Sequence, residues 1–181
     1  MKKHLIFIML LCVGLASPAW ASKMNIDPYF SVAVSALQVD LAGKKATTPG
    51  FAFIAGSDLN WISPNLGVEV RLGFGGQLST ASGGSINGYT SYLFKPRLPL
   101  TRQFDVYALL GVTAISMDIA RVSYADTSPS YGLGLAYQVP NESFSFTTEW
   151  LQYRKRSDQN STTMSGASIS GVSASFVFAY Y

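Results

Sequence analysis

Few side chains in this sequence could take part in catalysis. The only histidine, His4, and the only cysteine, Cys12, both lie within the first 21 residues. Without a histidine, a serine nucleophile in the rest of the chain lacks its usual base. Without histidine and cysteine, a metal ion would have only oxygen ligands. An acidic pair could still act as acid and base, but no spacing singles one out. We therefore expect no catalytic residues, no cofactor and no bound metal.

Charged residues recur on one face of segments in which apolar and other residues alternate. In Leu66–Phe74, leucine, valine and phenylalanine alternate with glycine, Glu69 and Arg71. Buried charges persist when they are paired, so this face predicts an ion-paired network inside the fold, with Arg71 neutralising at least one acid. A catalytic or conducting role is the alternative. The predicted members are Asp58, Glu69, Arg71, Asp105 and Glu149, joined by Lys95 if its segment keeps a regular register.

A second candidate site is the basic cluster Arg154-Lys155-Arg156, which ends one alternating segment and opens a polar stretch. Arginine binds phosphate through two parallel hydrogen bonds. The cluster therefore predicts a contact with phosphate groups at a lipid surface. The alternative is an ordinary basic loop in solvent.

These residues must be positioned by strands, because alternation with a period of two is the pattern of a β-strand. Eight segments show it with varying clarity. They predict an all-β fold with eight antiparallel strands. The segments are Tyr29–Val39, Gly50–Asn60, Leu66–Phe74, Gly88–Lys95, Phe104–Asp118, Tyr131–Val139, Phe144–Tyr153 and Ser168–Tyr181.

The connections between these segments alternate between short and long. Three are short and carry proline or asparagine, which suits tight turns: Trp61–Asn65, Pro96–Gln103 and Pro140–Ser143. Four are longer and polar: Leu41–Pro49, Gly75–Asn87, Ile119–Ser128 and Arg154–Ala167. Because Pro96 and Pro99 cannot donate to a strand ladder, we expect the fourth strand to stop pairing at or just after Lys95.

Composition and the N-terminus indicate an exported membrane protein. The chain is 48% hydrophobic and only 13% charged, whereas soluble domains are about 25% charged. Beyond the N-terminus it has no run of roughly 18 apolar residues that would form a membrane helix. Lys2, Lys3, the apolar run Leu5–Leu15 and Ala19-Trp20-Ala21 are typical of a signal peptide cleaved after Ala21. We expect residues 1–21 to be removed and residues 22–181 to form one domain with a nearly balanced charge that does not favour nucleic acid.

Two features favour a membrane barrel over a soluble one. The apolar face is rich in aromatic residues, whereas the opposite face carries small and polar residues, as expected inside a small barrel. Threading the strands up and down predicts two aromatic girdles. One contains Phe51, Phe53, Phe74, Tyr89, Tyr131, Trp150 and Tyr153, and the other contains Tyr29, Phe30, Trp61, Phe104, Tyr137, Phe144, Phe178 and Tyr180. A soluble up-and-down barrel or β-sandwich is the alternative.

The sequence resembles the outer-membrane β-barrel domain family in three features: the signal peptide, the eight alternating strands and the aromatic C-terminal strand VSASFVFAYY. This family includes OmpX-, Ail- and opacity-type proteins and the OmpA transmembrane domain. The resemblance implies an eight-stranded antiparallel up-and-down transmembrane β-barrel with long external loops and both termini in the periplasm. It also implies that the barrel-assembly machinery recognises the C-terminal strand. That family usually ends with its final residue in the outward phase, whereas here the phase of Phe176 and Phe178 points to Tyr180. Either Tyr181 is one extra residue or the strand shifts phase near its end.

The functional expectation is a non-enzymatic, monomeric protein of the bacterial outer membrane that supports envelope integrity or surface interaction through its loops. Its expected partners are outer-membrane lipids, including lipopolysaccharide at Arg154, Lys155 and Arg156. A narrow channel for small solutes is one alternative. An envelope lipid-modifying enzyme is another, and the absence of histidine after residue 21 disfavours it.

Overall fold

The computed structural model describes residues 26–41, 44–79, 84–119, 122–154 and 167–179. The expected signal peptide, Lys155, Arg156 and the last two tyrosines lie outside these ranges. Within the described residues, no helix is long and apolar enough to cross a membrane.

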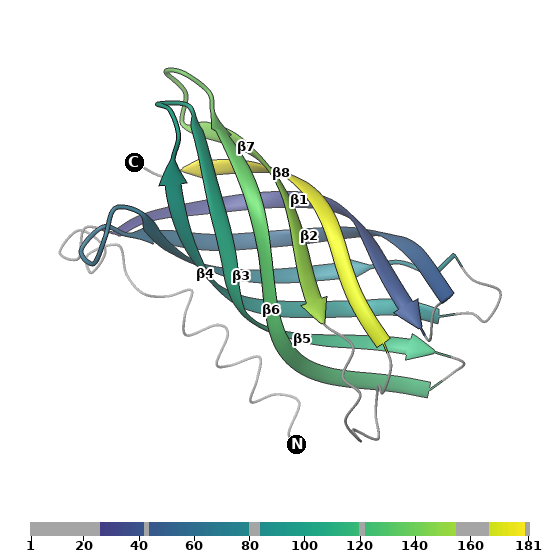
Figure 1. The fold of residues 1–181 in the computed structure, drawn as a ribbon. Coiled ribbons are helices and arrows are strands. Elements are labelled where there is room, and N and C mark those ends of the chain that lie inside the picture. Colours follow the sequence, from purple (N-terminus) through teal and green to yellow (C-terminus); the bar gives the residue numbers. More distant parts are fainter. Residues whose placement is uncertain (1–25, 42–43, 80–83, 120–121, 155–166, 180–181) are drawn as a thin grey trace.

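Eight strands form a closed barrel in which each strand pairs with its neighbours in the chain and β1 pairs with β8 (Figure 1). Every pairing is antiparallel. The predicted eight-stranded up-and-down topology is confirmed. The strands are β1 (Ile26–Leu41), β2 (Lys44–Leu59), β3 (Leu66–Gly75), β4 (Gly84–Pro99), β5 (Phe104–Ile119), β6 (Val122–Gln138), β7 (Phe144–Arg154) and β8 (Ala167–Ala179).

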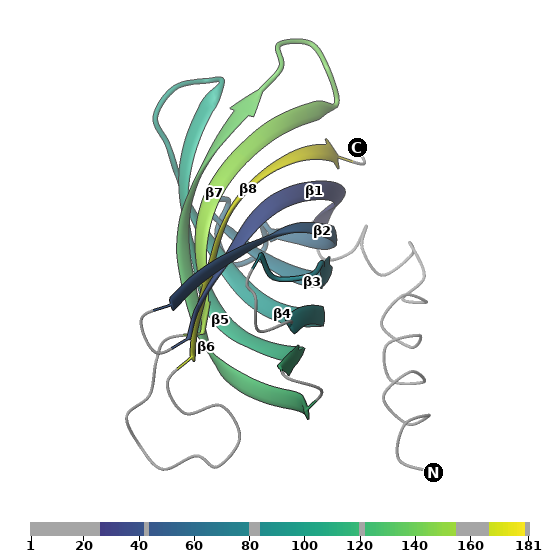
Figure 2. The ribbon, with the colours of Figure 1, turned by 90° about the vertical axis from the view of Figure 1, so that its right-hand side faces the viewer.

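The two ends of the barrel differ. At the terminal end, β1 begins, β8 ends, and residues 60–65, 100–103 and 139–143 connect neighbouring strands. At the opposite end, called the far end below, the connections are residues 42–43, 76–83, 120–121 and 155–166. The strands tilt and curve around a common axis (Figure 2), as closure of a barrel requires.

Several strands extend much further toward the far end than predicted. Lys44–Pro49 belongs to β2 and Val122–Ser128 to β6, so the expected long connections 41–49 and 119–128 are wrong. The pairing continues to Leu41↔Lys44 and Ile119↔Val122. Alternate residues such as Val39 and Met117 stay fully buried there, which explains why these hairpins remain paired.

β4 differs from its prediction in a similar way. It continues through both prolines to Pro99, beyond the expected segment Gly88–Lys95. The predicted break in pairing at or just after Lys95 is confirmed, because the ladder with β5 passes from Phe94↔Leu110 directly to Arg97↔Tyr107 and the ladder with β3 ends at Pro96. The missing proline N–H therefore interrupts the pairing without ending the strand.

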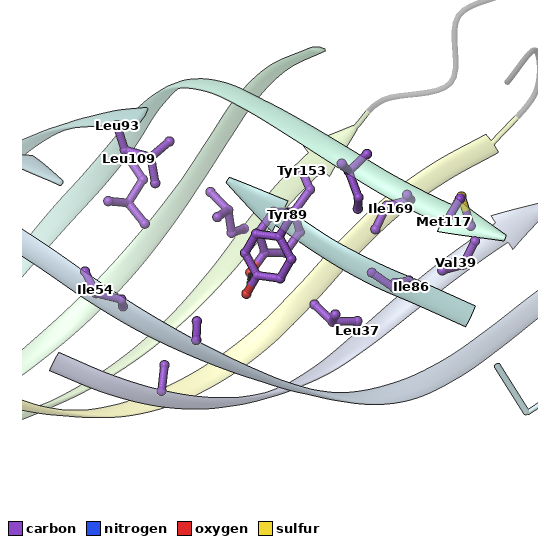
Figure 3. Close-up of a cluster of buried hydrophobic side chains, with 14 of the residues drawn as sticks. Leu37, Val39, Ile54, Ile86, Tyr89, Leu93, Leu109, Met117, Tyr153 and Ile169 are labelled. Carbon is purple, nitrogen blue, oxygen red and sulfur yellow. Dashed lines mark hydrogen bonds between the residues drawn. The ribbon is translucent and has the colours of Figure 1, made fainter. Parts of the chain in front are cut away.

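The interior of the barrel is more apolar than the sequence suggested. Toward the far end, the space enclosed by the strands is filled by large apolar side chains rather than only small and polar ones (Figure 3). An eight-stranded barrel is only wide enough for side chains to fill it, and aliphatic groups fill it without needing polar partners. The labelled members in Figure 3 are Leu37, Val39, Ile54, Ile86, Tyr89, Leu93, Leu109, Met117, Tyr153 and Ile169.

The aromatic side chains divide between the two faces of the wall. Most predicted girdle residues face outward, such as Phe74, which is 53% exposed, and Trp61, which is 60% exposed. Tyr29, Tyr89 and Tyr153 instead point into the lumen, so their assignment to the girdles was wrong. Each lies in the inward phase of its strand, and each hydroxyl finds a hydrogen-bond partner inside, which a lipid-facing tyrosine in the hydrocarbon region would lack.

Candidate functional site

The candidate site is a cluster of charged side chains in the lumen, on the terminal-end side of the apolar residues. Glu69 and Arg71 project inward from β3 because they are two residues apart on the same face. Lys95 on β4 and Glu149 on β7 complete the four charges. All four residues are nearly fully buried, with exposed fractions between 3% and 7%. Two cations and two carboxylates make the cluster neutral overall.

Glu69 accepts hydrogen bonds from three strands. Its Oε1 accepts from the Tyr29 hydroxyl at 2.7 Å and from Lys95 Nζ at 2.7 Å. Its Oε2 accepts from Arg71 Nε at 3.0 Å and from a second nitrogen of the same guanidinium. Each carboxylate oxygen therefore has two donors, which offsets the cost of removing a charge from water.

Glu149 is held in the same way from the other side of the lumen. The Arg71 guanidinium donates to both of its carboxylate oxygens, one of them at 3.0 Å. The Tyr107 hydroxyl and the Ser173 hydroxyl each donate at 3.0 Å. Arg71 thus bridges two acids on strands β3 and β7 by charge-assisted hydrogen bonds, the strongest kind available to it.

Lys95 also contacts two aromatic rings. Its Nζ lies 4.4 Å from the centre of the Tyr107 ring and 5.0 Å from that of Tyr29. Both distances are within the range of a cation–π interaction. The space enclosed by the cluster and its neighbours is too small to admit a water molecule, so the charges close the lumen at this depth.

A structural pattern occurs twice around the cluster. Tyr29 on β1 lies opposite Gly56 on β2, which lies opposite Glu69 on β3. Tyr107 on β5, Gly134 on β6 and Glu149 on β7 have the same register. In both cases the tyrosine reaches across the glycine to the acid.

The glycines are required because the tyrosine rings occupy the space of a side chain. A Cβ at Gly56 would lie 2.2 Å from Tyr29 Cζ, and one at Gly134 would lie 2.2 Å from Tyr107 Cζ. Gly73 accommodates Tyr89 in the same way, with 2.0 Å to its Cζ. Ring and glycine therefore form three cross-strand pairs in which a larger residue would overlap the ring unless the ring moved.

The structure brings together Glu69, Arg71 and Glu149, with Lys95, but not all of the predicted members. Asp58 pairs instead with Arg97 at 2.9 Å, in a partly exposed position toward the terminal end. Asp105 is half-buried near the start of β5, and no ion pair among the described residues joins it to the cluster. Both acids share the inward phase but lie too close to the terminal end to reach Arg71.

Sequence reasoning missed the tyrosine hydroxyls of Tyr29 and Tyr107 as members of the cluster. A signal for them exists in the sequence. Asp27-Pro28-Tyr29 and Asp105-Val106-Tyr107 share the spacing Asp-x-Tyr at the start of two strands. In each strand the tyrosine lies out of phase with the lipid-facing residues, which places it inside.

Arg154 occupies a different environment from the one expected. It is only 2% exposed, and its Nε donates to Asp126 Oδ2 at 2.6 Å. It also donates to the Ala167 carbonyl at 2.7 Å. A buried guanidinium with these partners is not available to an external phosphate, so the expected lipopolysaccharide contact of Arg154 is corrected to an internal link between β7 and β6.

The arrangement does not expose a reactive group. The carboxylates of Glu69 and Glu149 are saturated with donors, and the cluster has no space for a substrate. Among the residues that the structure describes, no group of three or more histidine, cysteine, aspartate or glutamate side chains could hold a metal ion. The chemistry of the cluster is that of mutual neutralisation and packing.

A closed antiparallel barrel with an aromatic, apolar exterior and an ion-paired interior defines a small transmembrane β-barrel. Residues 6–178 match the family model described as the outer membrane protein beta-barrel domain. The chain belongs to this family and is a protein of the bacterial outer membrane.

Solved structures of the same fold include two bacterial proteins. One is Ail, the attachment invasion locus protein of Yersinia pestis, which was solved with the heparin analogue sucrose octasulfate. It is 16% identical to this chain, the match covers 86% of this chain and 99% of Ail, and the TM-score is 0.59. Neisserial surface protein A is 13% identical, with 84% and 97% covered and a TM-score of 0.61. These likenesses show the fold. A comparison with curated protein sequences found no match.

Proposed function

We propose that this chain is a non-enzymatic outer-membrane protein whose closed barrel presents its far-end hairpins at the cell surface, where they support envelope integrity or bind surface partners. The observation that carries this proposal is the saturated charge cluster, which fills the lumen and leaves no space for water. Above it, the apolar side chains of Figure 3 fill the lumen toward the far end.

The closed lumen separates this proposal from the alternative of a narrow channel. Purified mature protein in planar bilayers should give no stable conductance above the leak of the lipid alone. The conductance of the wild-type protein is compared with that of Arg71→Ala, because this variant lacks the bridge between Glu69 and Glu149. A steady open channel in the wild-type protein would favour the porin-like alternative.

We further propose that both termini lie in the periplasm and that the far end faces outward. The length of the strands supports this orientation, because 16 or 17 residues in β1, β2, β5 and β6 exceed the roughly 9–11 that cross the bilayer. Outer-membrane barrels place their longer extensions outside and their short turns in the periplasm.

Single cysteines test the orientation, since the only natural cysteine lies in the expected signal peptide. Thr47→Cys and Ser123→Cys place a thiol at exposed far-end positions, and Trp61→Cys places one at the terminal end. On intact cells a membrane-impermeant maleimide should label the first two. It should label the third only after the outer membrane is permeabilised. The opposite pattern would reverse the orientation.

The enzyme alternative is tested separately. Lipid A and phospholipids from cells with and without the protein should have the same mass spectra, because Glu69 and Glu149 are bound to Arg71 and no histidine follows His4. A mass difference that depends on the protein would support a lipid-modifying activity.

Partners at the surface remain a prediction. Lys45 is exposed in the β1–β2 hairpin, and Lys155 and Arg156 follow β7 in the sequence. Ail, which shares the fold, has been solved with a heparin analogue. Binding of lipopolysaccharide to the purified protein, weakened by salt and by Lys45→Ala, would support anionic partners at the far end. The barrel-assembly machinery is the partner that we propose during insertion.

A further inference from the structure

The β5–β6 hairpin has an edge that the barrel leaves without a neighbouring strand. β6 begins at Val122, but its ladder with β7 begins only at Tyr131↔Gln152. Residues 122–130 therefore pair with β5 on one side, and no described strand pairs with them on the other. Figure 1 shows this part of β6 running on beyond the end of β7. We call the unpaired side of residues 122–130 the open edge.

The hydrogen bonds of β6 show which residues direct their backbone groups to the open edge. At the terminal end, Gln138 N donates toward β5, to the Gln103 carbonyl, and Val139 N donates toward β7, to the Phe144 carbonyl. Successive residues of a strand direct these groups to opposite edges, and the β5–β6 ladder has no break in register. Odd-numbered residues therefore face the open edge. They are Ser123, Ala125, Thr127 and Pro129.

The half of the open edge nearer the barrel wall is already protected. Pro129 has no N–H to donate, and the N–H of Thr127 donates to Asp126 Oδ1 at 2.9 Å. Proline and charged side chains are usual means by which a protein prevents an edge from pairing. The N–H groups of Ser123 and Ala125 have no such protection, since no hydrogen bond among the described residues engages them.

We infer that the open edge binds an extended segment of a partner protein along Val122–Asp126. A row of N–H and C=O groups at strand spacing is matched by the backbone of another strand. The side chains also suit an added strand. Ser123 and Ala125 are small and exposed on the outward face, and Val122, which is 50% exposed, lies on the opposite face. The partner strand therefore places an apolar residue beside Val122 and small or hydroxyl residues on its other face.

The partner is a different protein rather than a second copy of this chain. In two copies inserted in one membrane, β6 runs from the far end toward the terminal end, so two open edges would meet as parallel strands. Parallel pairing is the less stable arrangement, whereas a protein outside the cell can offer its strand antiparallel. The inference rests on the proposed function, because the far end must face outward, and it deepens that function by naming the chemistry of the surface partner.

Amide hydrogen exchange tests whether the edge is open in the free protein. In mature protein labelled with ¹⁵N and folded in micelles, the N–H groups of Ser123 and Ala125 should exchange at least about tenfold faster than those of Tyr124 and Asp126, which face β5. Protection of Ser123 and Ala125 would show that another part of the chain covers the edge, and it would overturn the inference.

A strand peptide tests binding. The probe is a fluorescein-labelled peptide of alternating threonine and valine with a lysine at each end. Its control carries methyl groups on two adjacent central backbone nitrogens, which removes one donor from each edge of the peptide. Ser123→Pro and Ala125→Pro remove the edge donors of the protein, whereas Ser123→Ala and Ala125→Ser keep them. Pro129 shows that β6 accommodates proline in this phase while it pairs with β5.

Fluorescence anisotropy should give a Kd at least about tenfold higher for both proline variants, and for the methylated peptide, than for the wild-type protein with the unmethylated peptide. Ser123→Ala and Ala125→Ser should bind like the wild-type protein. Heat-modifiable migration on gels shows which variants are folded. Equal binding by Ser123→Pro and Ser123→Ala, or no binding by the wild-type protein, would overturn the inference.

Two further outcomes are distinguishable. Exchange protection of Ser123 and Ala125 that grows with protein concentration would assign the edge to a second copy and overturn its assignment to a different protein. The orientation of the barrel is tested separately by the cysteine labels on intact cells. Failure of the peptide to bind the purified protein therefore overturns this inference alone, whereas reversed labelling overturns the proposed function as well.

Discussion

Arg71 uses its guanidinium to hold two strands that are not neighbours in the barrel. It bonds Glu69 on its own strand and Glu149 on β7, and both acids are buried with it. Removing one partner from a buried ion pair leaves the other charge without compensation, which costs far more than the pair contributes in total. The cost of deleting Arg71 is therefore a measure of how dry the lumen is.

Arg71→Ala should lower the free energy of unfolding by about 3–5 kcal/mol, because it leaves the buried Glu149 without a cation, whereas Glu69 keeps Lys95. Equilibrium unfolding in urea, in vesicles or micelles, measures the change. Arg97→Ala is the control, since its pair with Asp58 is partly exposed and should contribute about 1 kcal/mol or less. Equal losses in the two variants would mean that the cluster is as hydrated as the rim.

Tyr29→Phe and Tyr107→Phe should each cost about 1.5–3 kcal/mol, since each removes a hydrogen bond to a carboxylate while keeping the ring over its glycine. The same unfolding experiment applies, with Tyr92→Phe, which is 50% exposed on the outer wall, as the silent control. A loss for only one of the pair would show that the two repeats of the pattern are not equivalent.

For single residues, the sequence indicated which side chains face inward but not which of them lie at the same depth. The period of two places Glu69, Arg71, Asp58 and Asp105 in the inward phase, and they face inward. It contains no information on which inward residues share a depth, because depth depends on the tilt and stagger of strands around the closed barrel. Glu149 therefore reaches Arg71, whereas Asp58 pairs with Arg97.

Neighbouring strands are held in register by tyrosine rings that lie over glycines of the adjacent strand. Tyr107 crosses from β5 onto Gly134 of β6, and Tyr89 crosses from β4 onto Gly73 of β3. These contacts fix the register of each pair, since a shift by one residue would replace the glycine with a side chain that clashes.

Gly134→Ala should destabilise the barrel by about 1–3 kcal/mol, the usual range for overpacking, because its Cβ would overlap the Tyr107 ring. In the Tyr107→Ala background the same substitution should cost much less. A double-mutant cycle in urea measures this coupling. Gly67→Ala, whose Cβ would meet nothing closer than 3.2 Å, is the control. Additive losses at Gly134 and Tyr107 would contradict the packing explanation.

The strand cores were predictable and the strand ends were not. Leu66–Phe74 was found within one residue of β3 because its alternation is strong. The alternation weakens where threonine, serine and aspartate replace apolar residues, as in Thr47–Pro49 and Ser123–Ser128. Those residues pair because Thr48, inside the barrel, is fully buried and because the hairpins continue, which local composition does not reveal.

Across the whole molecule, the far end is asymmetric. β5 and β6 run on past the end of β7 (Figure 1), and the β6–β7 ladder begins only at Tyr131↔Gln152. Ser128 and Ser130 donate to the Tyr153 carbonyl at 2.9 and 3.0 Å, which caps β7 where it leaves its partner. The projecting β5–β6 hairpin is thus joined to the wall by side chains.

The expected signal peptide gives a prediction about processing. We expect the protein isolated from cells to begin at Ser22 and to fractionate with outer membranes, because Ala19-Trp20-Ala21 has the small residues that cleavage requires. Intact mass and N-terminal sequencing of the purified protein measure this. Trp20→Pro leaves both small residues, Ala19 and Ala21, in place, whereas Ala21→Leu removes one of them. Only Ala21→Leu should therefore retain residues 1–21. A wild-type protein that begins at Met1 would contradict the expectation.

Because some aromatic residues lie outside the barrel and others lie in the lumen, two spectroscopic signals of the unlabelled protein report on different regions. Trp150 is exposed on the outer wall and Trp61 is exposed in the turn after β2, and the remaining tryptophan, Trp20, lies in the expected signal peptide. Tyr89 and Tyr153, with ring centres 4.8 Å apart, are enclosed in the lumen. The fluorescence of Trp150 therefore reports the surrounding lipid and is quenched by brominated acyl chains. Near-ultraviolet circular dichroism from the enclosed tyrosines reports the interior, so loss of lipid contact and loss of lumen packing can be timed separately in one unlabelled sample.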